Sequence, residues 1–350
     1  PWEHRGGPMS LTDSEISSQL LRLYVARESA EILDLARISD GWETDVYAFA
    51  VEHGRAGERE REQLILRLYP GDDAAGKSAR EFNAMGKLYH LGYPVPRVIR
   101  LEQGSALLGK PFVVMEKIDG RSLGAISDAS PMQRKRELLA LFCGMFADLH
   151  TLDWRPFALD PSLHEVQRPD ETMRHQLSHW QAYTHALRFG AFDPVFAWLR
   201  ERLPGVQFGS PSVIHMDFHP YNILLREDGA AFVIDWTNVD VSDYRLDLSW
   251  TLLLMSTYGS PESRELVLGE YERAAGHSVE QIEYFEVAAC LRRLFSILAS
   301  LSAGAEKLGM RPGAEAMMKN ADHIGSVYAR LRQRTGIAIA EVDRLLSSLQ

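Results

Sequence analysis

The pattern of hydrophobic and polar positions contains most of its strand-like runs in the first third of the chain and is mainly helical in the remainder. Short apolar runs with strand character lie at 46–51, 64–69, 98–101 and 111–116, bounded by turn residues such as glycine and proline. They predict a small antiparallel sheet of about five strands. Helical spacing adds a helix at 12–24, which opens on a capping box of Thr12 and Glu15, and one at 74–91.

Beyond Gly120 the apolar residues recur at helical spacing. Helices are predicted at 130–152, 163–188, 192–203, 246–258, 261–275, 279–303, 313–333 and 338–348. We therefore expect an α+β protein with a sheet-rich domain at 11–116, a hinge at 117–122 and a mostly helical domain at 123–350. Ligand clefts tend to form between domains, so a binding site is expected there.

Composition narrows the class of protein without identifying it. The 350 residues are 45% hydrophobic and 25% charged, as in a globular chain with a substantial core. Cys143 and Cys290 fall in helical apolar patterns, and 1–10 lacks a secretory-signal pattern, so we expect no disulfide framework and a cytoplasmic location. A net charge of −10 argues against nucleic acid as a partner, and the most apolar run, 246–258, is too short to span a bilayer.

The apolar runs 223–225 and 230–234 are predicted to be the two strands of a hairpin. Asp228 and Gly229 between them are typical of a two-residue type I′ turn, in which both central positions need positive φ. Counting back from that turn places Asn222 opposite Asp235. Directly opposed residues have Cβ atoms roughly 4.5–5.5 Å apart, which suits an amide oxygen and a carboxylate that hold one small hard cation.

Each of these residues also has an ordinary structural interpretation. Asn222 alone is typical of a turn or strand end, and Asp235 alone of a polar stop after a strand. The joint pattern is harder to explain structurally, because a buried strand ends in a carboxylate opposite an amide, with Asp217 five residues upstream of that amide. We interpret the segment as a metal-holding pair with a third carboxylate free to handle a proton.

The run from His215 through Asp217 to Asn222, with Ile234 to Trp236, resembles the catalytic loop and metal-binding segment of the aminoglycoside phosphotransferase and choline kinase family. These small-molecule kinases are relatives of the protein kinases, and the likeness extends over about 41–254. It implies a protein-kinase-like fold with two lobes. By resemblance Asp217 is the catalytic base, Asn222 and Asp235 are Mg²⁺ ligands, and His215 supports the loop.

Asp243 and Asp247 lie downstream of the hairpin. The stretch that they bound resembles the acidic element that ties the next helix back to the catalytic loop in this family. Asp247 is equally well placed to be a plain N-cap of the apolar helix that follows. The two roles are compatible, and both stay open.

The family's nucleotide-binding features have counterparts in the first domain. The loop 39–47 occupies the place of the phosphate-covering loop, although Gly41 is its one glycine and a simple strand-connecting turn explains it equally well. Arg67, mid-strand, stands where kinases usually have lysine and would contact the α- and β-phosphates, unless it is a solvated charge on an exposed strand face. Glu81 on the next helix is the candidate ion-pair partner of Arg67, although most helix glutamates are surface residues.

The strand 113–118 resembles the hinge strand whose backbone groups receive the adenine or guanine edge. Glu116 and Ile118 are the candidate base-binding positions in it. Side chains do not indicate which base is bound, so the cofactors implied are ATP or GTP together with Mg²⁺.

The predicted reaction is transfer of a γ-phosphoryl group to a hydroxyl of a small molecule. An antibiotic such as an aminoglycoside or a macrolide is the leading acceptor, with choline, homoserine, sugar or hydroxyacyl compounds as metabolic alternatives. The acceptor pocket is expected at 154–203. Asp153, Asp170 and Glu171, with Asp243, could attract a cationic acceptor or could simply be solvated.

Two other functional classes compete with this prediction. The alternation of His215, Asp217 and His219 could place three ligands on one face, as in some zinc or two-metal hydrolases, but that leaves Asn222, Asp235 and the two-domain organisation unexplained. A non-catalytic nucleotide-binding pseudoenzyme is favoured by Arg67 and the glycine-poor loop. The three intact acid and amide positions argue against it.

Overall fold

The computed structural model describes residues 11–38, 44–55, 58–158, 170–303 and 319–349. The chain divides into two compact units. The described residues up to Gly86, with Pro96–Ile118, form the first unit. The second unit contains Lys87–Val95 and the described residues from Asp119 onward.

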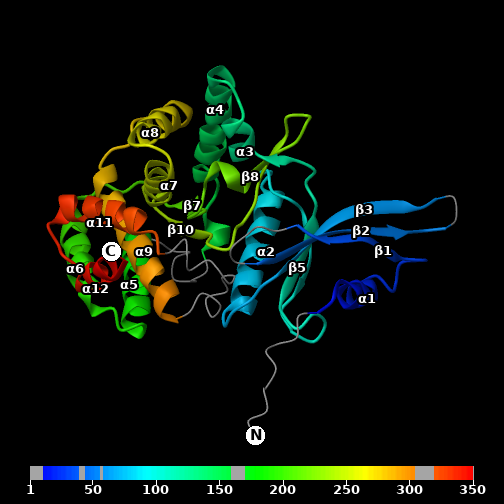
Figure 1. The fold of residues 1–350 in the computed structure, drawn as a ribbon. Helices are drawn as coiled ribbons and strands as arrows, with labels where there is room; N and C mark the ends of the chain where they lie inside the picture. Colours follow the sequence, from blue (N-terminus) through cyan, green and yellow to red (C-terminus); the bar gives the residue numbers. More distant parts are fainter. Residues whose placement is uncertain (1–10, 39–43, 56–57, 159–169, 304–318, 350) are drawn as a thin grey trace, which may run out of the picture. The chain divides into compact units, whose positions relative to one another are not determined.

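The first unit is built on one antiparallel sheet with the strand order β1-β2-β3-β5-β4 (Figure 1). Its elements are α1 (Asp13–Leu23), β1 (Glu31–Arg37), β2 (Asp45–His53), β3 (Glu60–Leu68), α2 (Ala74–His90), β4 (Val98–Glu102) and β5 (Phe112–Glu116). The predicted capping box begins α1, because Thr12 and Glu15 each accept from the other's backbone N–H. The predicted small sheet of about five antiparallel strands is confirmed.

β1 is the strand that the hydrophobic pattern did not predict. It lies at the sheet edge, and most of its side chains are exposed or half-buried, so it lacks a buried apolar face. A bulge between Leu33 and Ala36, with Asp34 at φ 53°, also breaks its alternation.

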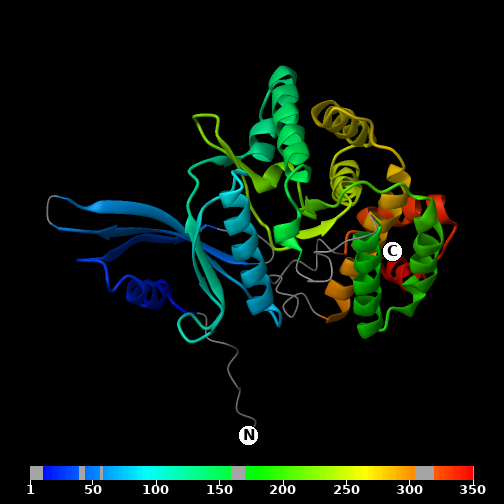
Figure 2. The same ribbon diagram turned by 180° about the vertical axis from the view of Figure 1, so that it is seen from behind.

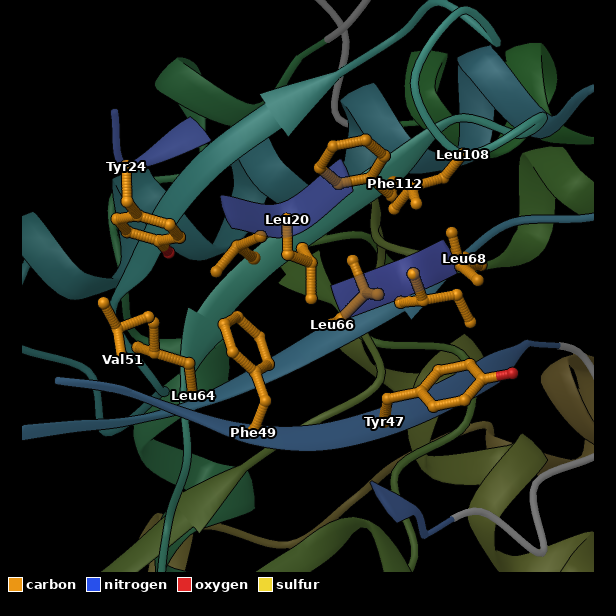
Figure 3. Close-up of a cluster of buried hydrophobic side chains, with 12 residues drawn as sticks. Leu20, Tyr24, Tyr47, Phe49, Val51, Leu64, Leu66, Leu68, Leu108 and Phe112 are labelled. Carbon is orange, nitrogen blue, oxygen red and sulfur yellow. The ribbon is translucent and has the colours of Figure 1, made fainter. Parts of the chain in front are cut away.

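One face of the sheet is packed against α1 by a cluster of apolar side chains (Figure 3). Leu64, Leu66 and Leu68 of β3 all belong to it. Successive side chains of a strand point to opposite faces, so Arg67 lies on the other face of the sheet. The strand pattern thus directs one charged side chain away from the apolar cluster.

The second unit is mostly helical. Its helices are α3 (Leu123–Asp128), α4 (Met132–His150), α5 (Glu171–Ala186), α6 (Asp193–Arg202), α7 (Tyr244–Tyr258), α8 (Pro261–Ala275), α9 (Ile282–Ala303), α11 (Ala321–Thr335) and α12 (Ala340–Leu349). α8 packs beside α4, and α9 packs on α7 (Figures 1 and 2). The predicted helices correspond to these elements except for the short α3, while the predicted starts at 163 and 313 lie outside the described residues.

Short strands interrupt the helices and flank the segment that contains Asp217, Asn222 and Asp235. β6 (Arg121–Ser122), β8 (Ile223–Leu225) and β9 (Ala231–Val233) form one sheet, and β7 (Ser212–Ile214) pairs with β10 (Asp240–Ser242). β8 and β9 are the predicted hairpin.

The predicted register of this hairpin is wrong by one residue. Ile223 pairs with Val233, so Asn222 stands opposite Ile234, whose N–H donates to the Asn222 carbonyl at 2.9 Å, and not opposite Asp235. The connection is a three-residue loop, 227–229, closed by Arg226 and Ala230. Gly229 takes the left-handed position at its end with φ 88°, the usual geometry of a three-residue hairpin loop.

Candidate active site

The loop after β7 is held in place from a neighbouring helix. The carboxylate of Asp247 on α7 accepts from the His215 N–H at 2.6 Å and from the Met216 N–H at 2.7 Å. Met216 has φ 62°, a left-handed conformation that costs a non-glycine residue energy unless its surroundings enforce it. The tie between α7 and the loop is confirmed. The N-cap prediction is wrong, because Asp243 caps α7 by accepting from the Arg245 N–H.

The ring of His215 is fully used within the protein. Its Nε2 lies 3.0 Å from the Ile234 carbonyl, and its Nδ1 accepts from the Asp217 N–H at 3.2 Å. Burial lowers the pKa of His215 despite the nearby charges of Asp247 and Asp217, so the ring is neutral. Neither nitrogen is left for a metal ion, which removes His215 from the zinc-site interpretation.

Asp217 projects from this loop with both carboxylate oxygens near donors. Oδ1 lies 3.4 Å from Trp250 Nε1, while Oδ2 lies 3.5 Å from Asn222 Nδ2 and 3.6 Å from His219 Nε2. These contacts are long for hydrogen bonds to a charged group, so they orient the carboxylate without saturating it. Burial alone would raise the pKa of Asp217, but His219, with smaller contributions from His215 and Trp250, holds the pKa well below its usual range.

His219 lies beside Asp217, with its Nε2 3.6 Å from Asp217 Oδ2. Burial lowers the pKa of His219, but the hydrogen bond and charge of Asp217, with Asp235 adding to them, leave this pKa above its usual value. Its Nδ1 is buried and finds no hydrogen-bond partner among the described residues.

Asn222 and Asp235 supply the oxygen atoms that a magnesium ion prefers. The Asn222 amide nitrogen donates to the Asp217 carbonyl at 3.0 Å, which leaves its amide oxygen as the remaining acceptor. Asp235 has φ 68°, and one of its carboxylate oxygens accepts from the Thr237 hydroxyl at 3.2 Å. The hairpin register does not place Asn222 and Asp235 opposite each other. The charge of Asp235 acts on His219, which lies 3.6 Å from Asp217.

The amide oxygen of Asn222 and the carboxylate of Asp235 are donors of the kind that Mg²⁺ binds. Within the described ranges, no group of three His, Cys, Asp or Glu side chains is arranged to hold a metal ion. An amide oxygen and one carboxylate are a common protein contribution to a magnesium ion that also binds water and phosphate.

Besides Trp250, two side chains of the second unit contact this loop without having been predicted. Thr251 on α7 donates to the Phe218 carbonyl at 2.8 Å, and Arg292 on α9 donates to the Met216 carbonyl at 3.1 Å. The Arg292 guanidinium also lies 4.1 Å from the centre of the Trp250 ring. Their positions far along the sequence give no local signal of these contacts.

In the first unit the ion pair expected between Arg67 and Glu81 is present. Arg67 Nη1 lies 2.8 Å from a Glu81 carboxylate oxygen, and both side chains are buried. The Tyr69 hydroxyl donates to the other oxygen of Glu81, and Arg67 Nη2 lies 3.4 Å from the Thr44 hydroxyl. The interpretations of Arg67 as a solvated charge and of Glu81 as a surface residue are therefore wrong.

The other residues predicted to bind the nucleotide are Glu116, Ile118 and Gly41. The Glu116 N–H is already used, since it donates to the Arg97 carbonyl at 2.9 Å, whereas no backbone carbonyl of the described part accepts from the Ile118 N–H. Gly41 lies outside the described residues.

Three of the acidic residues considered for a cationic acceptor are paired with arginines. Asp153 binds Arg155 at 2.9 Å and Asp170 binds Arg174 at 2.6 Å. Asp243 binds Arg245 at 2.7 Å, and both of these side chains are buried. These pairs reduce the negative charge available to attract a polycation.

Both cysteines, Cys143 and Cys290, are buried and free, and no helix in the described ranges is long and apolar enough to cross a bilayer.

A family model described as the phosphotransferase enzyme family matches residues 34–290. The matched segment contains the loop of Asp217, the hairpin and the strand of Arg67.

Among characterised proteins, the chain is similar to parts of longer proteins. It is 29% identical over 166 residues to acyl-CoA dehydrogenase family member 11 of Rattus norvegicus, covering 46% of this chain and 21% of that protein. It is 26% identical over 218 residues to acyl-CoA dehydrogenase family member 10 of Mus musculus, covering 59% of this chain and 19% of that protein. The chain thus spans about a fifth of the length of these relatives.

Solved structures share the fold at low sequence identity. A protein of Ralstonia eutropha JMP134, provisionally called an aminoglycoside phosphotransferase, is 17% identical with a TM-score of 0.60, covering 93% of this chain and 98% of that one. The gentamicin complex of APH(2″)-IIa is 18% identical with a TM-score of 0.56, covering 93% and 97%. The streptomycin–ATP complex of APH(2″)-IIa is 17% identical with a TM-score of 0.54, covering 84% and 91%. The α+β, protein-kinase-like fold is confirmed.

Proposed function

Because this chain belongs to the phosphotransferase enzyme family, we propose that it transfers the γ-phosphoryl group of ATP or GTP to a hydroxyl of a small molecule, with Asp217 as the base. The observation that carries the proposal is the state of Asp217. It stands on a loop whose backbone is fixed by Asp247, and its carboxylate is deprotonated, oriented by three donors and not saturated by them.

In the proposed mechanism Asp217 accepts the proton of the acceptor hydroxyl and aligns its oxygen for attack. Phosphoryl transfer has a loose transition state, so a base of low pKa is sufficient. Asn222 and Asp235 would hold Mg²⁺, which when bound offsets the negative charge of the phosphate oxygens. Asn222 has a second task, because its amide nitrogen binds the Asp217 carbonyl and so sets the position of the base.

The first unit is proposed to bind the nucleotide. Arg67 would contact the α- and β-phosphates in the place of the usual lysine, oriented by Glu81. Ile118 would receive the base edge through its backbone N–H, and Glu116 would contribute its carbonyl, since its N–H is occupied. A complete ion pair at Arg67 argues against the pseudoenzyme alternative.

Among acceptors we favour a hydroxyacyl compound, such as a hydroxyacyl thioester. Relatives that carry a segment like this chain within about a fifth of their length are named for acyl-CoA chemistry. An aminoglycoside is the second candidate, because the solved structures of similar fold include aminoglycoside complexes. The pairing of Asp153, Asp170 and Asp243 with arginines favours the first candidate, since a polycation needs unpaired acidic groups.

Asp217→Asn tests the proposal. The wild-type chain and the variant are assayed with MgATP and MgGTP against hydroxyacyl-CoA thioesters, aminoglycosides, macrolides, choline and homoserine. We expect Asp217→Asn to bind nucleotide normally and to lose about 100- to 10,000-fold in transfer. Asp228→Asn is the matched control, because it removes the same charge from the exposed hairpin loop. Near-normal turnover by Asp217→Asn refutes the base assignment, and absence of nucleotide binding by the wild type refutes the function.

A further inference from the structure

The position of Asp217 depends on contacts from α9 as well as from α7. Arg292 on α9 donates through Nη1 to the Met216 carbonyl at 3.1 Å, and its guanidinium lies 4.1 Å from the centre of the Trp250 ring. Trp250 in turn points its indole N–H toward Asp217 Oδ1 at 3.4 Å. Arg292 thus contacts the residue before the base and also the side chain that contacts the base.

Arg292 and His215 bind the two polar groups of one peptide bond. The Met216 carbonyl belongs to the peptide bond that leads into Asp217, and the N–H of the same bond donates to His215 Nδ1 at 3.2 Å. The Met216 N–H is bound by Asp247 at 2.7 Å. The backbone on both sides of the left-handed residue is therefore held, and Arg292 provides the contact on the carbonyl side.

Side-chain chemistry explains why arginine suits this place. Its planar guanidinium can stack flat on an indole while an N–H of its edge donates to a carbonyl. Lysine can do one of these but not both in the same geometry. Trp250 is buried, so the ring has little freedom once Arg292 covers it.

We propose that Arg292 and Trp250 form a positioning pair that sets the orientation of the Asp217 carboxylate. The inference rests on the proposed function, in which Asp217 is the base. Arg292 lies two residues beyond the segment 34–290 that the family model matches.

The test measures phosphate release from MgATP, and transfer to any acceptor that the panel identifies. Arg292→Met should lower kcat by about 10- to 100-fold, because a small displacement of a reacting group is enough for such a loss. KM for MgATP should stay within about twofold, because the variant alters the orientation of the base and not nucleotide binding. Trp250→Phe keeps a ring under the guanidinium and loses the N–H, so a smaller loss of kcat is expected.

Two further variants separate positioning from general structure. Arg292→Lys should recover part of the lost kcat, since it can still bind the Met216 carbonyl. The double variant of Arg292→Met and Trp250→Phe should lose no more than Arg292→Met alone, because both side chains act through one carboxylate. Arg293→Met is the matched control: Arg293 is the next residue of α9 and binds His323 and Tyr258 instead of the loop.

The outcomes discriminate clearly. A kcat for Arg292→Met within twofold of wild type, losses that multiply in the double variant, or an equal loss in Arg293→Met each overturn the inference. If Arg292→Met does not fold, Arg292→Lys and Trp250→Phe are measured in its place. A kcat within twofold of wild type for both variants then overturns the inference. Equal phosphate release by wild type and Asp217→Asn contradicts the proposed base itself, whereas a loss in Asp217→Asn but not in Arg292→Met contradicts the positioning pair alone.

Discussion

Replacing Asp247 by asparagine should weaken both the fold and catalysis. The carboxylate is fully buried and accepts from two backbone amides at 2.6 and 2.7 Å, and His150 Nε2 lies 3.4 Å from it. Asparagine offers one acceptor oxygen in place of two and directs an NH₂ group toward a site already occupied by N–H donors.

The size of the effect follows from these contacts. A hydrogen bond to a charged group contributes about 1.5–3 kcal/mol, and a buried donor left unsatisfied costs about 1–3 kcal/mol. The variant loses one such bond and leaves one such donor, so the free energy of unfolding should fall by roughly 2.5–6 kcal/mol. Met216, whose left-handed φ the carboxylate stabilises, should then relax and displace Asp217, which lowers kcat.

Urea unfolding gives the change in stability, and hydrogen exchange of the His215 and Met216 amides gives the local effect. Asp243→Asn is the control, because Asp243 is also buried at the start of α7 but binds Arg245 and not the loop. It should lose stability and keep kcat. The reasoning is refuted if Asp247→Asn unfolds within about 0.5 kcal/mol of wild type or keeps normal turnover.

Two further predictions concern buried basic side chains. Arg67→Met leaves the buried Glu81 carboxylate without its guanidinium, so stability should fall by about 3–5 kcal/mol, less in Arg67→Lys, as thermal unfolding of the two variants will show. Burial, with the charge of Arg293, lowers the pKa of His323 to about 4 from 6.5. Between those values the unfolded chain binds more protons, so the free energy of unfolding should rise with pH, by on the order of 1 kcal/mol once solvent screening is allowed for. Urea unfolding at pH 4.5 and 7.5 tests this, and His323→Gln should flatten the difference.

Local patterns predicted the elements that bury an apolar face. The helix of Thr12 and Glu15 and the strand of Arg67 each have a periodic apolar side, and both formed as expected. The hydrophobic pattern did not predict β1, because its residues are largely exposed at a sheet edge. The short α3 covers too few residues for a helical period to be recognised.

The register error has a specific cause. Asp228 and Gly229 suit a two-residue type I′ turn, but the same glycine also suits the left-handed position that ends a three-residue loop. The Ala230 N–H donates to the Asp228 side chain at 3.0 Å, and the Arg226 N–H donates to the Ala230 carbonyl at 2.9 Å. Those contacts select the longer loop, and they depend on backbone geometry that the residue types do not specify.

The candidate site shows which part of an active site a sequence motif can contain. The proposed reacting groups, Asp217, Asn222 and Asp235, lie on one hairpin and the loop that enters it, so their spacing alone suggests their chemistry. The groups that orient them come from α7 and α9. Trp250 belongs to a helix in which nearly every residue of the first turns is buried, so its side chain reads as core packing, and Arg292 reads as one more helix arginine. The Asp217 carboxylate is held by contacts longer than 3.3 Å, so its position depends on support from these helices. We therefore expect substitutions in α9 that remove this support to lower turnover as much as substitutions at the less critical positions of the motif.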